Sequence, residues 1–420
     1  MNLVYTKSAF FALAGRVISA GAQFLLTVII TRFSGTEEAG IFFSIYVWIL
    51  LASAMGQCGL SMVALRLSEV ARENQGLKIR SILIVTIVSA FILGGGSLFF
   101  ANFFIDIFSK SNVSIIFLML WVAGFSINQI NADIYRGLNN QIAAALLGSI
   151  GLIAMLLAVT IVLLSGGAFN NIFIAISICW SVIGMGGIFF TLRTIKDHNI
   201  FNPGRNTVSA SRVYEVMREA AKSMLASIFA FIATQADQLV LSSLYSAPTY
   251  AIYAAGVKCA QVFGIVANML NSYIGPILLA SIKSGKDNIQ EVIQKNNRHV
   301  SLLIIPLVML FVFFSKVIVE FLFGKNYTDA SLIFSFFIVA SAFNICTGPK
   351  GFLLWLLGHE NTVIKIMTFF AALISIFCCI AVGNVSMTMI ALIISIFQIF
   401  QYIVEGHFLK EITKLNIFKF

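Results

Sequence analysis

Four ionisable side chains lie inside apolar stretches that are long enough to cross a membrane. Arg16, Lys258 and Lys350 are basic, and Asp237 is acidic. A charge at the centre of a membrane helix costs about 2.5–3.5 kcal/mol on insertion scales, so each of these residues needs a physical reason. Cations held at depth can neutralise an anionic ligand, and the three basic residues are therefore the first candidates for cargo binding.

Structural interpretations compete with the functional ones. Asp237 and Lys258 fall at similar depth in neighbouring antiparallel helices, so they form either a structural ion pair or part of a coupling mechanism. Arg16 and Lys350 can instead extend their charged ends to the inner membrane surface. Asp133 and Arg136, three residues apart at the end of an apolar stretch, predict a surface pair.

Uncharged polar residues also gather within the apolar stretches. Side chains of this kind either join helices through hydrogen bonds or line a wet cavity, and both interpretations stay open. The candidates for a cavity are Asn128, Asn131, Gln235 and Gln261, within the larger set Ser126, Gln129, Thr234, Gln238, Asn268 and Asn271.

Several other kinds of site are disfavoured. The chain has no phosphate-binding Gly-Lys-Ser/Thr loop, its four His are scattered, and its six Cys lie in or beside apolar runs without metal-ligand spacing. The outer loops are too short to hold an acid and a base beside a sugar. We therefore expect neither an enzyme nor a metal or cofactor. We also expect no nucleic-acid partner, because the basic residues lie in loops between apolar runs.

Composition determines which elements must position these residues. Hydrophobic residues make up 59% of the 420 residues and charged residues only 10%, against about 25% charged in a soluble domain. The apolar runs reach about twenty residues without alternation, which indicates helices rather than barrel strands. In hydrocarbon every backbone N–H and C=O needs an internal partner, which a helix supplies.

The sequence predicts an all-α integral membrane protein with about twelve transmembrane helices. They are expected near residues 8–31, 40–66, 81–104, 113–133, 142–165, 172–192, 220–245, 249–281, 299–323, 330–357, 362–384 and 387–409.

The loops predict orientation and division into lobes. Twenty Lys and Arg fall in one set of alternating loops and four in the other, which places both termini in the cytoplasm. The polar segment 193–219 separates a six-helix lobe, 1–192, from a second one, 220–420. From Ser211 onward this segment is either a surface helix or an extension of the helix at 220–245. Gly40-Ile41-Phe42 and Ala251-Ile252-Tyr253 match in placement, which favours a parallel pseudo-repeat.

Several segments resemble the polysaccharide exporters of the multidrug/oligosaccharidyl-lipid/polysaccharide superfamily, especially its O-antigen unit flippases. The segment 323–330, Phe-Gly-Lys-Asn-Tyr-Thr-Asp-Ala, is similar to the family's Phe-Gly-x-x-Tyr-x-x-Ala. Weaker similarities lie at 31–42, where Ser34 stands in place of the usual Leu, at Gly59-Leu60 with Arg66, at 236–241, at Tyr253-Ala254-Ala255 and at 356–360. The resemblance implies two six-helix lobes around a central cavity and identifies no cargo-binding residue.

This resemblance implies a flippase for undecaprenyl-pyrophosphate-linked oligosaccharide repeat units of O-antigen or a related surface polysaccharide. Such a protein would sit in the bacterial inner membrane and work by alternating access, beside other polysaccharide-assembly proteins. Arg16, Lys350 and Lys258 would then neutralise the diphosphate. A cation-coupled multidrug exporter of the same superfamily is the alternative, and a non-transporting scaffold is a third possibility. The excess of intramembrane basic residues over Asp237 favours an anionic cargo.

Overall fold

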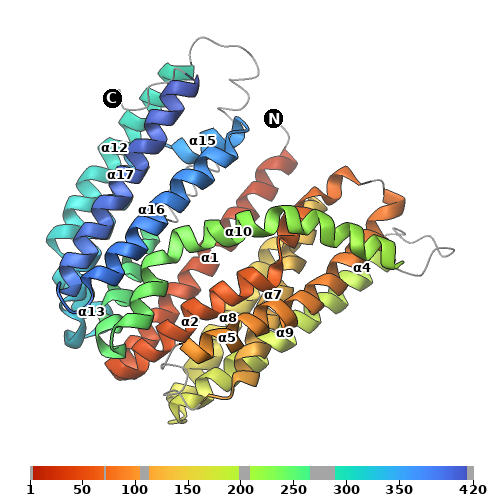
Figure 1. The fold of residues 1–420 in the computed structure, drawn as a ribbon, viewed down its shortest axis with the longest axis horizontal. Helices are drawn as coiled ribbons and strands as arrows, with labels where there is room; N and C mark the ends of the chain where they lie inside the picture. Colours follow the sequence, from red (N-terminus) through yellow and green to blue (C-terminus); the bar gives the residue numbers. More distant parts are fainter. Residues whose placement is uncertain (1–2, 71, 105–112, 198–208, 265–288, 414–420) are drawn as a thin grey trace. The chain divides into compact units, whose positions relative to one another are not determined.

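The computed structural model describes residues 3–70, 72–104, 113–197, 209–264 and 289–413, and the regular elements in these ranges are all helices (Figure 1). Ten of the described helices are long and apolar enough to cross a membrane. The chain is thus an all-helical, multi-pass integral membrane protein. The α-helices are α1 (Leu3–Phe33), α2 (Thr36–Gln57), α3 (Leu60–Leu65), α4 (Arg72–Ser89), α5 (Gly96–Phe104), α7 (Ile115–Gly137), α8 (Gln141–Leu164), α9 (Phe169–Asp197), α10 (Ala210–Leu244), α12 (Ile289–Phe313), α13 (Ser315–Phe323), α14 (Ala330–Cys346), α15 (Lys350–Leu356), α16 (Glu360–Ala381) and α17 (Met387–Thr413).

Two of the twelve predicted spans do not appear among these ten. Residues 247–264 are helical, and the remainder of the span predicted at 249–281 lies outside the described residues. The span predicted at 330–357 is divided, and its first part, α14, has 17 residues. The number twelve and the cytoplasmic placement of both termini therefore stay predictions.

Backbone breaks correct several predicted boundaries. The helix expected over 40–66 ends at Gln57, because Cys58 and Gly59 take φ values of 49° and 73° before α3 begins. The helix expected over 330–357 ends at Cys346, since Gly348 has a φ of 77° and Pro349 has no N–H to donate. This break places Lys350 in the first turn of the new helix α15.

Three further segments differ from the predicted bounds or settle an open alternative. A short π-helix, η2 (Ala90–Gly95), joins α4 to α5 within the helix expected over 81–104. The helix expected over 299–323 is divided at Phe314 into α12 and α13. The polar segment from Ser211 onward belongs to α10, which is one continuous helix of 35 residues, so the prediction that it extends the following helix is confirmed.

The chain folds as two compact units. Unit 1 contains residues up to Leu26 and Ser44–Phe231, and unit 2 contains Thr27–Phe43 and Ile232–Phe420. Helices α1 and α10 each contribute residues to both units. The lobe boundaries predicted from the sequence, with a linker at 193–219, stay a prediction.

In unit 1, α7 packs against α8, α9, α3 and α4. Glycines permit the closest of these approaches. A Cβ atom at Gly124 would lie 2.3 Å from the carbonyl oxygen of Trp180, and Gly184 faces Gly124 from α9. Small residues of this kind let helix backbones meet in a membrane, where dispersion contacts replace the hydrophobic effect as the driving force.

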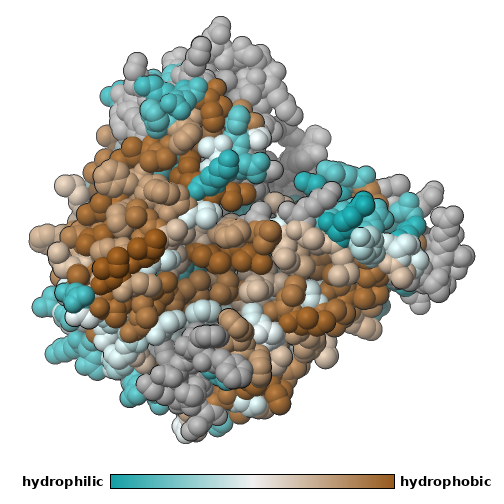
Figure 2. Space-filling model, viewed as in Figure 1, coloured by the Kyte–Doolittle hydropathy of each residue, from teal (hydrophilic) through white to brown (hydrophobic). Residues whose placement is uncertain are grey.

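In unit 2, α14 packs against α12 and α17, while α15 lies against α16 and α17. Helices α16 and α17 run alongside each other (Figure 1). The outward faces of α12 and α13 are strongly apolar, and Figure 2 shows how widely such side chains cover one face of the molecule. Leu302, Phe313 and Phe321 are 69%, 81% and 76% exposed, which suits contact with lipid but not with water.

We expect Gly124→Ala to destabilise unit 1, because the added methyl group would overlap the Trp180 carbonyl. Overpacking of this kind costs about 1–3 kcal/mol in soluble proteins. Gly186→Ala in α9 is the matched control, since no atom lies within 4 Å of the added Cβ and Ala favours a helix by up to about 1 kcal/mol. Thermal unfolding of the detergent-solubilised protein should show a lower midpoint for Gly124→Ala only. Equal midpoints would contradict the close helix contact.

Candidate functional site

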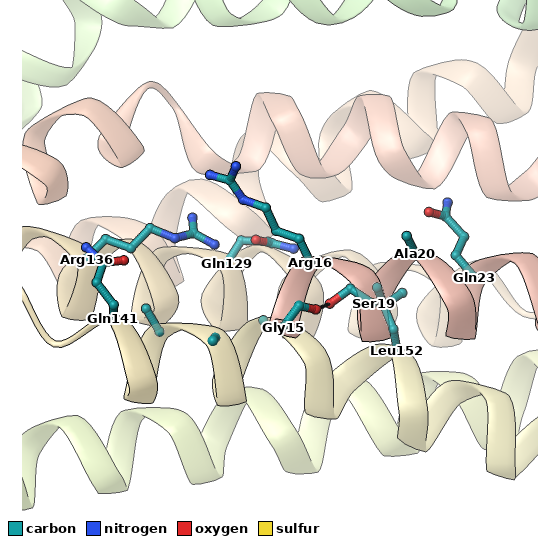
Figure 3. A pocket seen from close by; sticks show the side chains of 12 residues that line it. Gly15, Arg16, Ser19, Ala20, Gln23, Gln129, Arg136, Gln141 and Leu152 are labelled. Atoms are coloured by element: carbon teal, nitrogen blue, oxygen red, sulfur yellow. Dashed lines mark hydrogen bonds between the residues drawn. The ribbon is translucent and has the colours of Figure 1, made fainter. Parts of the chain in front are cut away.

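A polar pocket of about 320 Å³ opens between α1, α7 and α8, entirely within unit 1 (Figure 3). Two arginines and three glutamines supply most of its hydrogen-bonding groups, and small residues form much of the remaining wall. The lining residues are Gly15, Arg16, Ser19, Ala20, Gln23, Gln129, Arg136, Gln141, Ala144, Ala145, Gly148 and Leu152.

Small residues of the pocket wall allow α1 to pack closely against α8. A Cβ atom at Gly15 would lie 2.7 Å from the Cβ of Ala145, so only glycine permits this approach. Ser149 of α8 donates to the carbonyl oxygen of Gly15 at 3.0 Å, and Ser19 donates to Ser149 at 3.1 Å. These contacts position the helical turn that carries Arg16 beside the polar residues of α7 and α8.

The charged side chains in the described lining are both cationic. Arg16 is exposed and Arg136 is partly buried. In Figure 3 both guanidinium groups extend from their helices toward the region beside Gln129. Each guanidinium offers five N–H donors in a planar fork, which matches the oxygens of a phosphate or carboxylate. Amide groups from Gln23, Gln129 and Gln141 can donate to and accept from sugar hydroxyls.

Arg136 has a carboxylate partner that is not part of the lining. Its Nη1 contacts Oδ1 of Asp133, one turn earlier in α7. Asp133 is only 6% exposed, so the pair predicted to lie at the surface has a buried anionic member. Asp133 faces the helix packing of unit 1 while its arginine partner reaches the pocket.

The pocket lies near one end of the membrane spans. Arg136 is next to the last residue of α7, and Gln141 is the first residue of α8. The turn of α1 that carries Arg16 meets α7 and α8 at this end. Because α1 and α7 run in opposite directions in the predicted topology, this placement is what brings the two arginines together.

The two asparagines predicted to line a cavity are buried in helix packing. Asn128 and Asn131 are both 0% exposed. Asn128 donates to the carbonyl oxygen of Leu147 at 2.9 Å, which joins α7 to α8. Asn131 donates to Ile127 at 3.0 Å and accepts from Thr191 at 2.9 Å, which joins α7 to α9. In this structure both connect helices, and neither appears in the lining of the pocket.

In unit 2, Asp237 has a different hydrogen-bond partner from the one predicted. Its Oδ2 accepts from the hydroxyl of Tyr253 at 2.6 Å, and the carboxylate is 6% exposed. Lys258 donates to Gln261 at 3.3 Å and is close enough to Asp237 for an electrostatic interaction. A direct Asp237–Lys258 ion pair is not among the ion pairs of the described residues, so a role of these two in structure or coupling stays a prediction.

Gln235 and Gln261 were also predicted to line a cavity. Gln235 accepts from Gln238 at 2.6 Å, one turn along α10. Gln261 is exposed and accepts from Lys258. Both side chains have local partners on their own helices, and their contact with a cargo stays a prediction.

Lys350 is nearly inaccessible, with 1% exposure, at the start of α15. Its ammonium group donates to Thr347 and, at 3.3 Å, to Asn344. The same nitrogen lies 5.1 Å from the ring centre of Tyr402 and 5.8 Å from that of Phe343, within reach of cation–π attraction. These contacts satisfy the ammonium within unit 2.

A buried carboxylate on α17 accompanies this lysine. Glu405 is 6% exposed, interacts electrostatically with Lys350, and accepts from Gln401 at 3.0 Å. Glu405 was not among the predicted site residues, although an acidic residue inside the span predicted at 387–409 is a visible signal in the sequence. Arg136 was interpreted only as a surface partner of Asp133, and nothing in the sequence placed it opposite Arg16.

A protein family model described as polysaccharide biosynthesis protein matches residues 5–282. No curated protein sequence matches the chain.

Solved structures with the same fold cover nearly the whole chain. An inward-facing multidrug resistance MATE family transporter of the MOP superfamily has a TM-score of 0.69 and 14% identity, and the match covers 97% of this chain and 98% of that one. The lipid II flippase MurJ in an inward closed conformation has a TM-score of 0.65 and 15% identity, with 97% and 88% covered. A MOP superfamily transporter from Pyrococcus furiosus, described as having a binding pocket of reversed polarity, has a TM-score of 0.62 and 13% identity, with 96% and 95% covered.

These likenesses show a MATE-like fold, as the sequence resemblance implied. The family model covers well over half of the chain. The chain that builds this arginine- and glutamine-lined pocket therefore belongs to the polysaccharide biosynthesis protein family, within the fold of the MOP superfamily transporters.

Proposed function

We propose that the chain is a flippase for undecaprenyl-pyrophosphate-linked oligosaccharide repeat units of a bacterial surface polysaccharide. The observation that carries this proposal is the pocket of unit 1, where Arg16 and Arg136 stand among three glutamines. A lipid-linked repeat unit combines a diphosphate, which guanidinium groups bind, with sugar hydroxyls, which amides bind. Its polyprenyl tail can remain in lipid while the polar part occupies the protein.

The location of the pocket supports the same proposal. Arg136 and Gln141 lie at the ends of α7 and α8 that meet the N-terminal half of α1. In the predicted orientation this is the cytoplasmic side of a bacterial inner membrane, where a lipid-linked intermediate would enter. Alternating access would then carry the polar headgroup across about 30 Å of hydrocarbon.

Two comparisons agree with this cargo class. The family is described by polysaccharide biosynthesis, and one solved structure with the same fold is a lipid II flippase. The alternative is a cation-coupled multidrug exporter, which the fold of the MATE transporter allows. A cationic drug would be repelled by two guanidinium groups in one pocket, so we favour the anionic cargo.

Lys350 has a different place in this proposal from Arg16. Lys350 is satisfied within unit 2 by Thr347, Asn344 and two aromatic rings, and a carboxylate accompanies it. It could contact a diphosphate only after leaving these partners. We therefore assign the first contact with the headgroup to Arg16 and Arg136, and regard the Lys350–Glu405 couple as a structural or coupling element of unit 2.

Deletion of the gene should abolish the surface polysaccharide and leave lipid-linked repeat units on the cytoplasmic leaflet. The measurement is surface polysaccharide by immunoblot, together with accessibility of the lipid-linked intermediate in intact cells. The strain must lack a second flippase with overlapping specificity. Intact surface polysaccharide in that strain would refute the proposal, and resistance to cationic drugs that falls on deletion would favour the exporter.

Restoration of the deleted strain with variants should show whether Arg16 contacts the cargo. We expect Arg16→Ala to lower export about tenfold or more, since a charge-assisted hydrogen bond contributes about 1.5–3 kcal/mol. Arg16→Lys should retain part of the activity, because the charge remains while the fork geometry is lost. Arg218→Ala is the matched control, since Arg218 is exposed on α10 and does not line the pocket. Equal export by the Ala variants at equal abundance would exclude Arg16 from cargo binding.

A double-mutant cycle tests the Lys350–Glu405 couple. Lys350→Met and Glu405→Gln should each lower the abundance of the folded protein, because each leaves one buried charge without its counter-charge, at about 3–5 kcal/mol. The double variant should regain much of that abundance. If abundance is restored but export is not, the Lys350–Glu405 pair acts in the transport mechanism rather than in stability alone. Additive losses would show that the two charges do not interact.

A further inference from the structure

Asp133 occupies an unusual position relative to the pocket of unit 1. It is 6% exposed and absent from the pocket lining, yet its carboxylate contacts the guanidinium of Arg136, which does line the pocket. Arg136 therefore stands between a buried anion and an open anion-binding space. Asp133 cannot touch a cargo itself and can influence one only through the arginine and through its own charge.

The charges around the pocket explain why this position matters. The lining has two described positive charges, Arg16 and Arg136, and Asp133 is the carboxylate that contacts one of them. The carboxylate occupies one N–H direction of Arg136 and leaves other donors of the five for a ligand. Nη2 of Arg136 lies beside Gly148, where an added Cβ would be 3.8 Å away, and both residues line the pocket. An anion can therefore bind without breaking the Asp133–Arg136 pair.

We propose that Asp133 is an internal counter-ion that weakens the hold of the Arg16–Arg136 pocket on a diphosphate. Repulsion between the buried carboxylate and the bound diphosphate lowers affinity, while the ion pair prevents Arg136 from giving all its donors to the cargo. A carrier gains from such a device, because cargo bound too tightly on one side of the membrane is not released on the other. The choice of a diphosphate as the cargo rests on the proposed function.

The structure also shows how the counter-ion is held in place. Asp133 lies on α7, the helix that packs against α8, α9, α3 and α4, and Asp133 itself is only 6% exposed. A side chain on such a helix has little freedom to turn into the pocket. The carboxylate can therefore repel a bound anion continuously and cannot swing away to relieve the repulsion.

Binding of inorganic pyrophosphate to the purified full chain in lipid nanodiscs tests the inference by titration calorimetry. We expect Asp133→Asn to bind pyrophosphate about tenfold more tightly than the unchanged protein, by analogy with the strength of one charge-assisted hydrogen bond. Asp133→Glu keeps the charge and should retain the original affinity within a few-fold. Arg136→Ala should weaken binding. Adding Asp133→Asn to it should tighten binding by less than it does in the unchanged protein, because the direct repulsion is removed but no ion pair is left to release.

Unfolding midpoints of the same samples distinguish a folding defect from an effect on binding. If Asp133→Asn keeps its midpoint and binds pyrophosphate equally well or more weakly, Asp133 merely orients Arg136 and the inference is overturned. If Asp133→Asn lowers the midpoint, the pyrophosphate affinities of Asp133→Glu and the unchanged protein are compared at a lower temperature. A loss of binding in Asp133→Glu would then contradict the role assigned to the charge of Asp133. Absence of pyrophosphate binding by every variant also overturns the inference.

Export separates this inference from the proposed function. The Asp133→Asn variant, restored to the deleted strain, should export more slowly than the unchanged protein despite its tighter binding. If deletion abolishes surface polysaccharide but Asp133→Asn exports normally and binds normally, the flippase proposal stands and the counter-ion proposal fails. If deletion has no effect on surface polysaccharide while Asp133→Asn still tightens pyrophosphate binding, the anion site stands and the cargo must be another anion.

Discussion

Hydrocarbon solvates neither a backbone amide nor a charge, and the structure depends on that constraint. Helices satisfy the backbone, so the described elements are all helices. Charges need a second solution, because no regular element neutralises them. In this chain the solutions differ from site to site: Asp133 pairs with Arg136, Lys350 lies beside Glu405, and Asp237 accepts from Tyr253. The candidate functions follow from which of these charges are fully satisfied.

The buried lysine with many partners and the arginines that line the pocket lie in different units. In unit 2, Lys350 is inaccessible and has two hydrogen-bond acceptors, two aromatic rings and a carboxylate around it. In unit 1, Arg16 is exposed and Arg136 shares its guanidinium between Asp133 and an open pocket. Donors that face open space can bind a ligand, whereas donors already used in packing cannot do so without rearrangement. This difference is why the pocket of unit 1, rather than Lys350, carries the proposed function.

The fold alone does not distinguish the cargo. A multidrug transporter and a lipid II flippase both match the chain at similar TM-scores. Cargo choice must instead come from side chains grafted on this fold, and the sign of charge in the pocket is the strongest physical discriminator. Two guanidinium groups with one buried carboxylate leave an excess of positive charge, which suits an anionic headgroup and opposes a cationic drug.

Composition and apolar run length by themselves determined the fold class, because a helix is the form in which a twenty-residue apolar segment satisfies its own backbone. They did not determine where the helices break, since the breaks at Cys58–Gly59 and Gly348–Pro349 depend on local φ values and on close packing. The sequence identified Arg16 as a candidate, but it did not identify Arg136 as a residue of the same pocket.

Tertiary structure decided which polar residues meet. An asparagine within a span can either line a cavity or join helices. Only the hydrogen bonds to α8 and α9 show that Asn128 and Asn131 join helices. Arg136 lines the same pocket as Arg16, and Glu405 interacts electrostatically with Lys350. No local sequence pattern predicts contacts between residues so far apart in the chain. Periodicity along one helix assigns residues to a face, whereas the neighbour opposite that face depends on how several helices pack together.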